Sequence, residues 1–360
     1  MVLRNTPERL FATLFLTALI LIGVGVISVY TSSSLYAENA FGNEWLFLTR
    51  HVIALLIGAF ISSVAFLVPT SFWNTHASLF LGLSLVASIV FTQSSYSGYI
   101  TSIDNGIISL LGTSMSLREV VLLFYSLYLS SFLTDRFKFD RSFWQTYFSL
   151  SIIISLVVAL LYFQQDFLSI PFVLVFSAVL IASVEDSLQY AVGFSLILIL
   201  SLALFLWLNP TIIVLGSSLK NGFGNSDVLT LISQGGWSGT GIVSFNQILS
   251  QDIFWNSNAA FMFIGQQLGF LGSTFVMGAC FLCIATCMWL ARTLVDPFSI
   301  IFSVSSGVFI GLYSVFHVLT VLGVLSGSIL PLPFISYGMS GVLPFFFLLG
   351  VIARSLFARK

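Results

Sequence analysis

Long uninterrupted apolar stretches are the feature that most limits the folds open to this chain of 360 residues. A helix needs about 20 apolar residues to cross a hydrocarbon core about 30 Å thick, because each residue rises about 1.5 Å. Ten such stretches occur, at residues 10–32, 46–68, 79–91, 117–134, 144–163, 167–184, 189–208, 260–290, 298–325 and 342–357. The third and the last are short, and we expect them to extend or tilt. The sequence therefore predicts an all-α polytopic membrane protein with about ten transmembrane helices.

Composition excludes other classes of protein. Only 7% of the residues are charged, against about a quarter in soluble domains, so the chain cannot cover a globule with polar surface. The net charge of −1 gives no electrostatic basis for binding nucleic acid. Three cysteines share one apolar stretch, where packing is the favoured interpretation. No metal motif and no Ser-His-Asp constellation is found, so no cofactor is evident, although a divalent cation stays open.

The basic residues orient the predicted helices, because Lys and Arg favour the cytoplasmic side of a membrane. With both termini in the cytoplasm, ten crossings place nine of the twelve Lys and Arg residues inside. These nine are Arg4, Arg9, Arg136, Lys138, Arg141, Arg292, Arg354, Arg359 and Lys360. The exceptions are Arg50, Arg118 and Lys220 on the outer side. The long connections, 93–116 and especially 209–259, also lie outside, and we expect residues 1–360 to form one membrane domain whose site opens outward.

Charged residues near the membrane are the first site candidates, because a charge in lipid is costly. Arg50 has two interpretations of equal weight, an arginine reaching the lipid headgroups or a cation that binds phosphate. We expect Asp166 to cap the following helix, Asp252 to be solvated in its loop, and Glu119 to pair with Arg118.

Two glycine- or proline-rich segments could add backbone groups to a site. The amides of Gly235, Gly236, Gly239 and Gly241 could cradle an anion, although the signal is weak. Pro331 and Pro333 predict an extended re-entry into the outer leaflet. Further along the chain, Gly265 and Gly269 predict close approach of another helix, Gln266 and Gln267 need partners, and His317 is expected to be bonded inside the bundle.

Several motifs together resemble one known family. They are QGGWSGTG at 234–241, IGQQLGFLG at 264–272, DPF at 296–298 and PLPFISYGMSG at 331–341. In order and spacing they resemble the SEDS proteins, the bacterial shape, elongation, division and sporulation family (FtsW/RodA/SpoVE-like). YTSSSLYA at 30–37 and Arg50 resemble the first outer loop and second helix of that family. The resemblance implies a ten-helix SEDS-type bundle with both termini cytoplasmic, and it is strongest after residue 231.

The resemblance also implies a function, peptidoglycan glycosyl transfer in bacterial cell division or cell-shape maintenance. The substrate would be lipid II, a disaccharide-pentapeptide on undecaprenyl pyrophosphate, and the partner a class B penicillin-binding protein at the bacterial inner (cytoplasmic) membrane. Arg50 would contact the pyrophosphate. The other substrate-binding residues implied are Asp166, Gly235, Gly236, Trp237, Pro333, Ser336, Tyr337 and Gly338.

The chain departs from the family at the residues expected to carry the chemistry. Asn258 occupies the position of the aspartate taken to be essential, and Gln266 and Gln267 replace paired glutamates. An amide cannot accept a proton as a carboxylate does. Asp252 is a candidate replacement, although it requires about six inserted residues before the helix. The lysine expected three residues after Glu119 is Leu122.

Three functions therefore stay open. The chain is a divergent SEDS glycosyltransferase, a non-catalytic member that binds precursor or scaffolds the transpeptidase, or a flippase for a lipid-linked precursor. The division and elongation branches are not separated by these residues.

Overall fold

The computed structural model describes residues 6–96, 103–104, 107–110, 113–139, 143–184, 188–208, 230, 232–241, 260–325 and 329–357. Within these residues, ten helices match the ten predicted stretches one to one. They are α1 (Thr6–Phe41), α2 (Leu46–Leu67), α3 (Thr70–Tyr96), α4 (Leu117–Phe139), α5 (Phe143–Phe163), α6 (Ser169–Val184), α7 (Leu188–Leu208), α10 (Ala260–Ala291), α11 (Pro297–Val321) and α12 (Leu343–Phe357).

Helix boundaries follow local chemistry rather than hydropathy alone. α3 begins at Thr70, directly after Pro69, and not at Leu79 as predicted, because polar residues in its first turns lower the hydropathy without interrupting the helix. α11 begins after Asp296, whose side chain accepts a hydrogen bond from the Ser299 amide at 3.1 Å, and Pro297 occupies the first turn.

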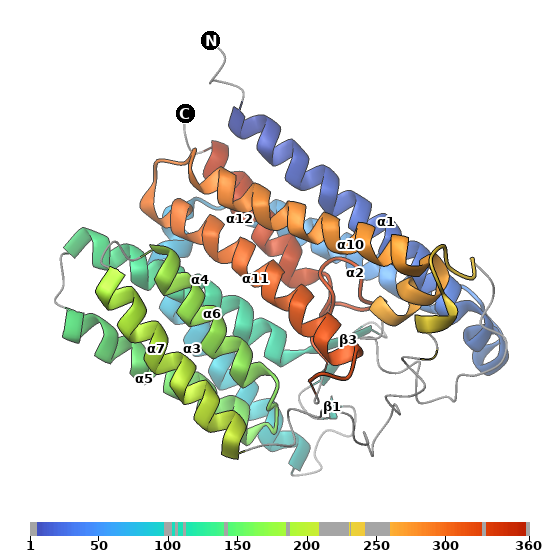
Figure 1. The fold of residues 1–360 in the computed structure, drawn as a ribbon, viewed down its shortest axis with the longest axis horizontal. Coiled ribbons are helices and arrows are strands. Elements are labelled where there is room, and N and C mark those ends of the chain that lie inside the picture. The colour runs from blue at the N-terminus through green and yellow to red at the C-terminus, as the bar shows by residue number, and fades with distance from the viewer. Residues whose placement is uncertain are drawn as a thin grey trace.

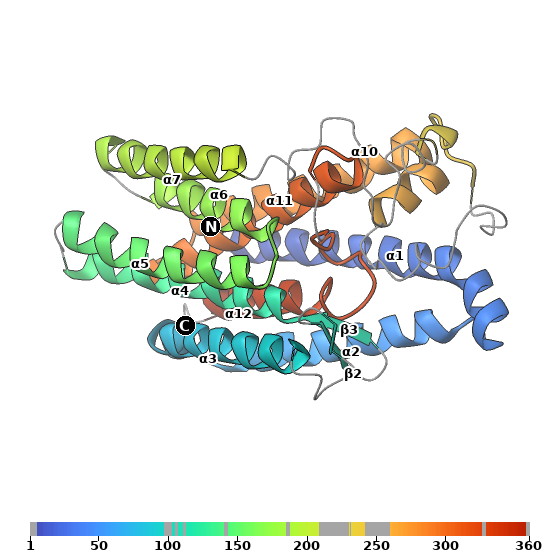
Figure 2. The same cartoon turned by 90° about the horizontal axis from the view of Figure 1, so that it is seen from below.

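The helices form a bundle in which α11 is central. It packs against α10, α4, α6 and α12, while α1 lies between α10 and α2 (Figures 1 and 2). The core contains many aromatic rings, among them Phe172, Phe309 and Tyr313, with the centroids of Phe172 and Tyr313 4.9 Å apart.

Exposed side chains on the outer helices are largely apolar, as expected for lipid contact. Leu56, Phe60, Phe163 and Phe281 are each more than 60% exposed. Six helices are long and apolar enough to cross a membrane, and the described residues contain four shorter apolar helices. The protein is therefore a multi-pass membrane protein.

α1 begins and α12 ends at the same end of the bundle, as an even number of crossings requires (Figure 1). The opposite end, which we call the outer end, carries a small antiparallel sheet that the sequence analysis did not predict. Its strands are β1 (Ile103–Asp104), β2 (Ile107–Leu110) and β3 (Thr113–Ser116), paired in the order β1-β2-β3. Residues 329–342, which we call the proline loop, lie at the same end between α11 and α12.

Candidate functional site

A buried cluster of charges joins four parts of the outer end. Arg118, in the first turn of α4, donates from Nε to Glu119 at 3.0 Å and from Nη1 to Asp166 at 3.2 Å. Its Nη2 lies 2.9 Å from Glu119 and donates to the Ile329 carbonyl at 3.3 Å. The Tyr313 hydroxyl of α11 donates to the other oxygen of Glu119. We call Arg118, Glu119, Asp166 and Tyr313 the closed cluster, because every guanidinium nitrogen of Arg118 has a partner in the protein.

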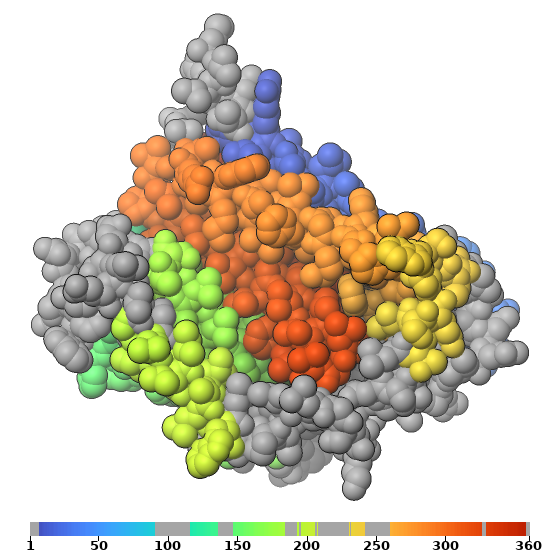
Figure 3. Space-filling view, viewed as in Figure 1, coloured from blue at the N-terminus to red at the C-terminus, as the bar shows by residue number. Residues whose placement is uncertain are grey.

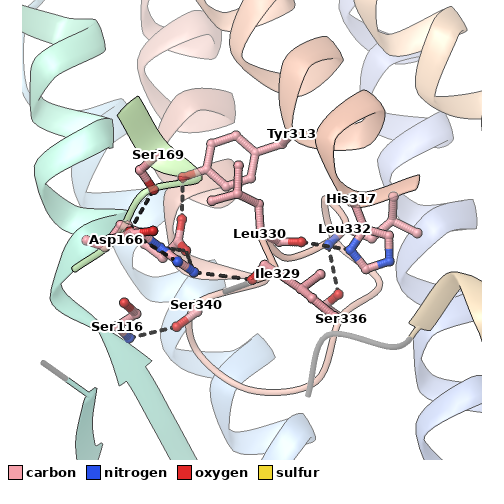
Figure 4. A network of polar contacts seen from close by, with 12 residues as sticks. Ser116, Asp166, Ser169, Tyr313, His317, Ile329, Leu330, Leu332, Ser336 and Ser340 are labelled. Atoms are coloured by element: carbon pink, nitrogen blue, oxygen red, sulfur yellow. Dashed lines mark hydrogen bonds and ion pairs between the residues drawn. The ribbon is translucent and has the colours of Figure 1, made fainter. Parts of the chain in front are cut away.

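Asp166 joins this cluster from the turn before α6, which begins at Ser169. The Asp166 carboxylate accepts hydrogen bonds from the Ser169 hydroxyl at 2.7 Å and from Arg118 (Figure 4). The predicted pairing of Glu119 with Arg118 is confirmed. The carboxylate that was expected to cap α6 contacts its first residue and also reaches α4.

The proline loop is held by hydrogen bonds to its neighbours and to itself. The Ser336 hydroxyl accepts from the Leu332 amide at 2.8 Å, and the Ser340 hydroxyl accepts from the Ser116 amide at 2.8 Å (Figure 4). Pro333 is buried, and Gly338 has a φ of 92°, which glycine adopts without strain. Ser336 is fully buried, so its hydroxyl serves the loop.

His317 connects the proline loop with the start of α10. Its Nδ1 lies 2.7 Å from the Leu330 carbonyl oxygen, and its Nε2 accepts from the Phe261 amide at 3.3 Å. The expectation that this histidine is bonded inside the bundle is confirmed.

The glycine segment, residues 232–241, packs its backbone against a break in α10. Gly269 has non-helical angles (φ 65°, ψ −161°), and residues on both sides of it bond to the segment. The amides of Thr240 and Gly241 donate to Gln266 and Gln267, while those of Phe270 and Leu271 donate to Gly236 and Trp237, at 2.9 to 3.2 Å. Figure 3 shows the yellow glycine segment lying on the outer part of α10.

This packing explains the glycines without a ligand. A Cβ at Gly239 would lie 2.0 Å from the Gln267 carbonyl oxygen, and one at Gly235 would lie 2.1 Å from that of Gly265. The amides of Gly235, Gly236, Gly239 and Gly241 all donate to carbonyls of this chain. The expected anion cradle is therefore wrong in this conformation. Gly265 is approached by Ile232, which lies in the helical stretch 232–234, and Gly269 by the backbone of Trp237 and Gly239.

Two predicted features of this region have clear positions. Gln267 accepts from the Thr31 hydroxyl at 2.9 Å, and Gln266 donates to Gln234 at 3.4 Å, so each amide has one partner. The Gln266 oxygen and the Gln267 nitrogen are buried without a hydrogen-bond partner among the described residues. Trp237 is 74% exposed and contacts the edge of Phe270 with ring centroids 5.3 Å apart. Its indole thus lies on the surface of the outer end, where tryptophan suits a membrane–water boundary.

Arg50 lies in a different environment. We call Arg50, Tyr337 and His51 together the open corner. The partly exposed guanidinium lies 5.8 Å above the Phe47 ring, and Arg50 makes no ion pair with any described residue. The buried Tyr337 hydroxyl faces Arg50, and no other described residue bonds to it. Burial raises the pKa of Tyr337, while the charge of Arg50 and its contact with the hydroxyl oppose that rise.

His51 lies beside Tyr337 in the open corner. The two ring centroids are 6.1 Å apart, and His51 is fully buried. Neither ring nitrogen of His51 has a hydrogen-bond partner within the described part of the chain. A buried polar atom without a partner costs about 1–3 kcal/mol, so these side chains are held at an energetic cost.

Three further predictions concern the Asn258 and Asp252 positions, a metal site and the three cysteines. Asn258 and Asp252 lie outside the described residues. No group of three His, Cys, Asp or Glu side chains that could hold a metal ion is found among the residues described. Cys280, Cys283 and Cys287 are buried as free thiols in α10, which agrees with packing.

Sequence reasoning missed that Arg118 and Tyr313 belong to one buried cluster with Asp166. The signal available was that Arg118 and Glu119 begin one predicted span while Asp166 precedes another on the same side of the membrane. Tyr313 had no such signal, because a single tyrosine in an apolar stretch is common in helix cores.

A family model and curated relatives match nearly the whole chain. The family model described as "Cell cycle protein" (FTSW_RODA_SPOVE) matches residues 11–359. A protein of Nitrosomonas europaea named "Probable peptidoglycan glycosyltransferase FtsW" is 24% identical over 350 residues, covering 91% of this chain and 87% of that protein. One of the same name from Coxiella burnetii is 27% identical over 367 residues, covering 95% of each.

Solved structures share the fold. One chain belongs to a structure described as "Structural coordination of polymerization and crosslinking by a peptidoglycan synthase complex", with a TM-score of 0.73 at 19% identity. The match covers 96% of this chain and 97% of that one. The rod shape determining protein RodA of Thermus thermophilus matches with a TM-score of 0.64 at 17% identity, covering 94% of each chain.

Proposed function

Because the chain belongs to the FtsW, RodA and SpoVE family of cell cycle proteins, we propose that it acts on lipid II at the outer face of the bacterial cytoplasmic membrane. The proposed activity is that of a peptidoglycan glycosyltransferase of the SEDS type. Relatives that match across nearly the whole chain carry this activity in their names, which supports the proposal. The fold is shared with a chain of a peptidoglycan synthase complex, which supports it further.

The observation that carries the proposal is the open corner. Apart from their contact with each other, Arg50 presents a guanidinium and Tyr337 a hydroxyl that no described residue engages through an ion pair or a hydrogen bond. Guanidinium groups bind phosphate through charge-assisted hydrogen bonds. We assign these two side chains to the pyrophosphate of lipid II. Asp166, Pro333, Ser336 and Gly338 then act indirectly, because they shape the outer end instead of offering unbonded donors.

Glycosyl transfer places a further demand on the site. A hydroxyl of the acceptor sugar attacks the anomeric carbon of the donor, the bond to pyrophosphate breaks, and the hydroxyl proton passes to a base. The amide of Asn258 is not such a base, and Asp252 is the carboxylate we propose for the role. The Arg50 guanidinium would stabilise the charge of the departing pyrophosphate.

Polymerisation of lipid II by the purified full-length chain, with its class B penicillin-binding protein, tests this function. We expect glycan strands from the unaltered protein and none from Asp252→Ala. Asp252→Asn provides the matched control, since it removes the carboxylate and keeps the size of the side chain. Strand formation that survives both changes would eliminate Asp252 as the base.

Asn258 favours a second candidate function, in which the protein binds lipid II or scaffolds the transpeptidase without catalysis. In that case the unaltered chain binds precursor and forms no strands. Asn258→Asp is then expected to introduce strand formation, and vigorous polymerisation by the unaltered chain would reject this candidate.

The partner and the cation are also proposals. We expect a class B penicillin-binding protein to copurify with the chain from bacterial membranes. A divalent cation would have to be held by the pyrophosphate itself, because Glu119 and Asp166 already pair with Arg118. Loss of lipid II binding on chelation, restored by Mg²⁺, would establish the cation.

A further inference from the structure

The first turn of α10 requires hydrogen-bond acceptors from outside the helix. The first four amides of an α-helix have no partner within it, and Phe261 is the second residue of α10. The Phe261 side chain is buried, where water cannot readily satisfy its amide. The His317 ring supplies the acceptor from α11, with the Phe261 nitrogen 3.3 Å from Nε2.

These contacts define the state of the imidazole. Because Nε2 accepts from an amide, it carries no proton, and the ring proton must lie on Nδ1. There it donates to the Leu330 carbonyl oxygen at 2.7 Å. Only the neutral Nδ1–H tautomer makes both hydrogen bonds, since a ring protonated on Nε2 would present a donor to the Phe261 amide.

Two side chains on the same face of α11 hold two adjacent carbonyls of the proline loop, one indirectly and one directly. Tyr313 lies one turn before His317 and acts through Glu119 and Arg118 on the Ile329 carbonyl. His317 holds the next carbonyl, that of Leu330, directly. Figure 4 shows both side chains projecting from α11 toward the loop. Only the His317 contact also reaches α10.

We propose that His317 is a positioning residue that sets the start of α10 against the proline loop. The loop carries Tyr337 of the open corner, and α10 begins two residues after Asn258 in the sequence. One imidazole therefore links the proline loop, which the proposed function assigns to the site, with the helix start that follows Asn258 of the second candidate function. The inference rests on the proposed function only in that assignment, because the hydrogen bonds themselves are independent of any activity.

Hydrogen exchange of backbone amides in the full-length protein in nanodiscs tests the proposal. His317→Phe keeps an aromatic ring and removes both hydrogen bonds. We expect exchange of the Phe261 amide to rise roughly five- to tenfold, the effect of losing one hydrogen bond, with no change at 276–290 of α10. His317→Gln restores an acceptor and should recover part of the protection.

His51→Phe is the matched control, because His51 is also fully buried but has no described hydrogen-bond partner. It should leave exchange at Phe261 unchanged. Unaltered Phe261 exchange in His317→Phe would overturn the proposal. So would a uniform rise along α10 and α11, because that result would make His317 a packing residue only.

A second measurement leaves His317 intact and is independent of glycosyltransferase activity. The chain has three histidines, so His51→Gln with His76→Gln leaves His317 as the only source of imidazole ¹⁵N signals. We expect a protonated Nδ1 and an unprotonated Nε2 at neutral pH. A protonated Nε2 would overturn the assignment even if the protein polymerises lipid II, and failure to polymerise would leave this result unaffected.

Discussion

Two arginines at the outer end of the bundle differ in how far the protein itself engages the guanidinium group. Arg118 is about nine-tenths buried, and the protein itself supplies acceptors for its Nε, Nη1 and Nη2. Arg50 is partly exposed, lies over the Phe47 ring and has no ion pair with a described residue. The closed cluster neutralises its own charges, whereas the open corner leaves a cation without an anion. The difference teaches that partners, rather than residue type, decide which arginine can bind phosphate.

The largest effect is expected where the closed cluster loses its cation. Arg118→Met leaves Glu119 and Asp166 buried without their counter-charge, so the free energy of unfolding should fall by about 3–5 kcal/mol. Unfolding of the purified protein in detergent measures this. The triple change Arg118→Met, Glu119→Gln, Asp166→Asn should recover most of the loss. An equal loss in Arg50→Met would break the comparison between the two arginines.

The second-largest effect is expected at the open corner, as a loss of ligand affinity. Arg50→Gln should weaken binding of undecaprenyl pyrophosphate by roughly ten- to a hundredfold, because a hydrogen bond to a charged group contributes about 1.5–3 kcal/mol. Titration calorimetry in nanodiscs measures the affinity. Arg50→Lys keeps the charge and should lose less. Unchanged affinity in Arg50→Gln would remove the open corner from the proposed site.

Substitution of Gly239 tests whether the glycine segment, like the closed cluster, has a structural role. Gly239→Ala places a Cβ 2.0 Å from the Gln267 oxygen at a φ of 83°. We expect a loss of about 1–3 kcal/mol in the free energy of unfolding, since overpacking forces the backbone to shift. Gly23→Ala is the control, because its Cβ would meet nothing within 4 Å. If Gly239→Ala keeps full stability but binds precursor more weakly, the glycine segment takes part in binding.

The smallest effect is expected at Tyr337. Tyr337→Phe should weaken undecaprenyl pyrophosphate binding roughly tenfold, the lower end of the effect of a hydrogen bond to a charged group, and leave stability nearly unchanged. Because burial raises the pKa of Tyr337 above its usual value of about 10, the hydroxyl stays protonated and its contribution should persist as pH rises to 10. A contribution that disappears below pH 9 would contradict this assignment.

The predicted site residues divide according to their surroundings. Arg50 stays a predicted phosphate-binding cation, and the structure brings no counter-charge from the described residues to it. Gly235 and Gly236 changed, because their amides bond within the glycine segment, and Ser336 changed, because its hydroxyl accepts from Leu332. These contacts depend on loop conformation, which residue type and spacing did not reveal. Asp252 and Asn258 stay predictions.

The sequence alone determined that this is a helical membrane protein with about ten helices, because bilayer thickness sets helix length. It also determined that the first and last described helices begin and end on one side, because an even number of crossings returns the chain to its starting side. It also determined the family, through motifs that lie far apart along the chain. Only the tertiary structure decided which polar groups are already engaged. The partners of Arg118, His317 and Gln267 come from segments remote in sequence, and hydrogen bonding depends on proximity in space that spacing along the chain does not specify.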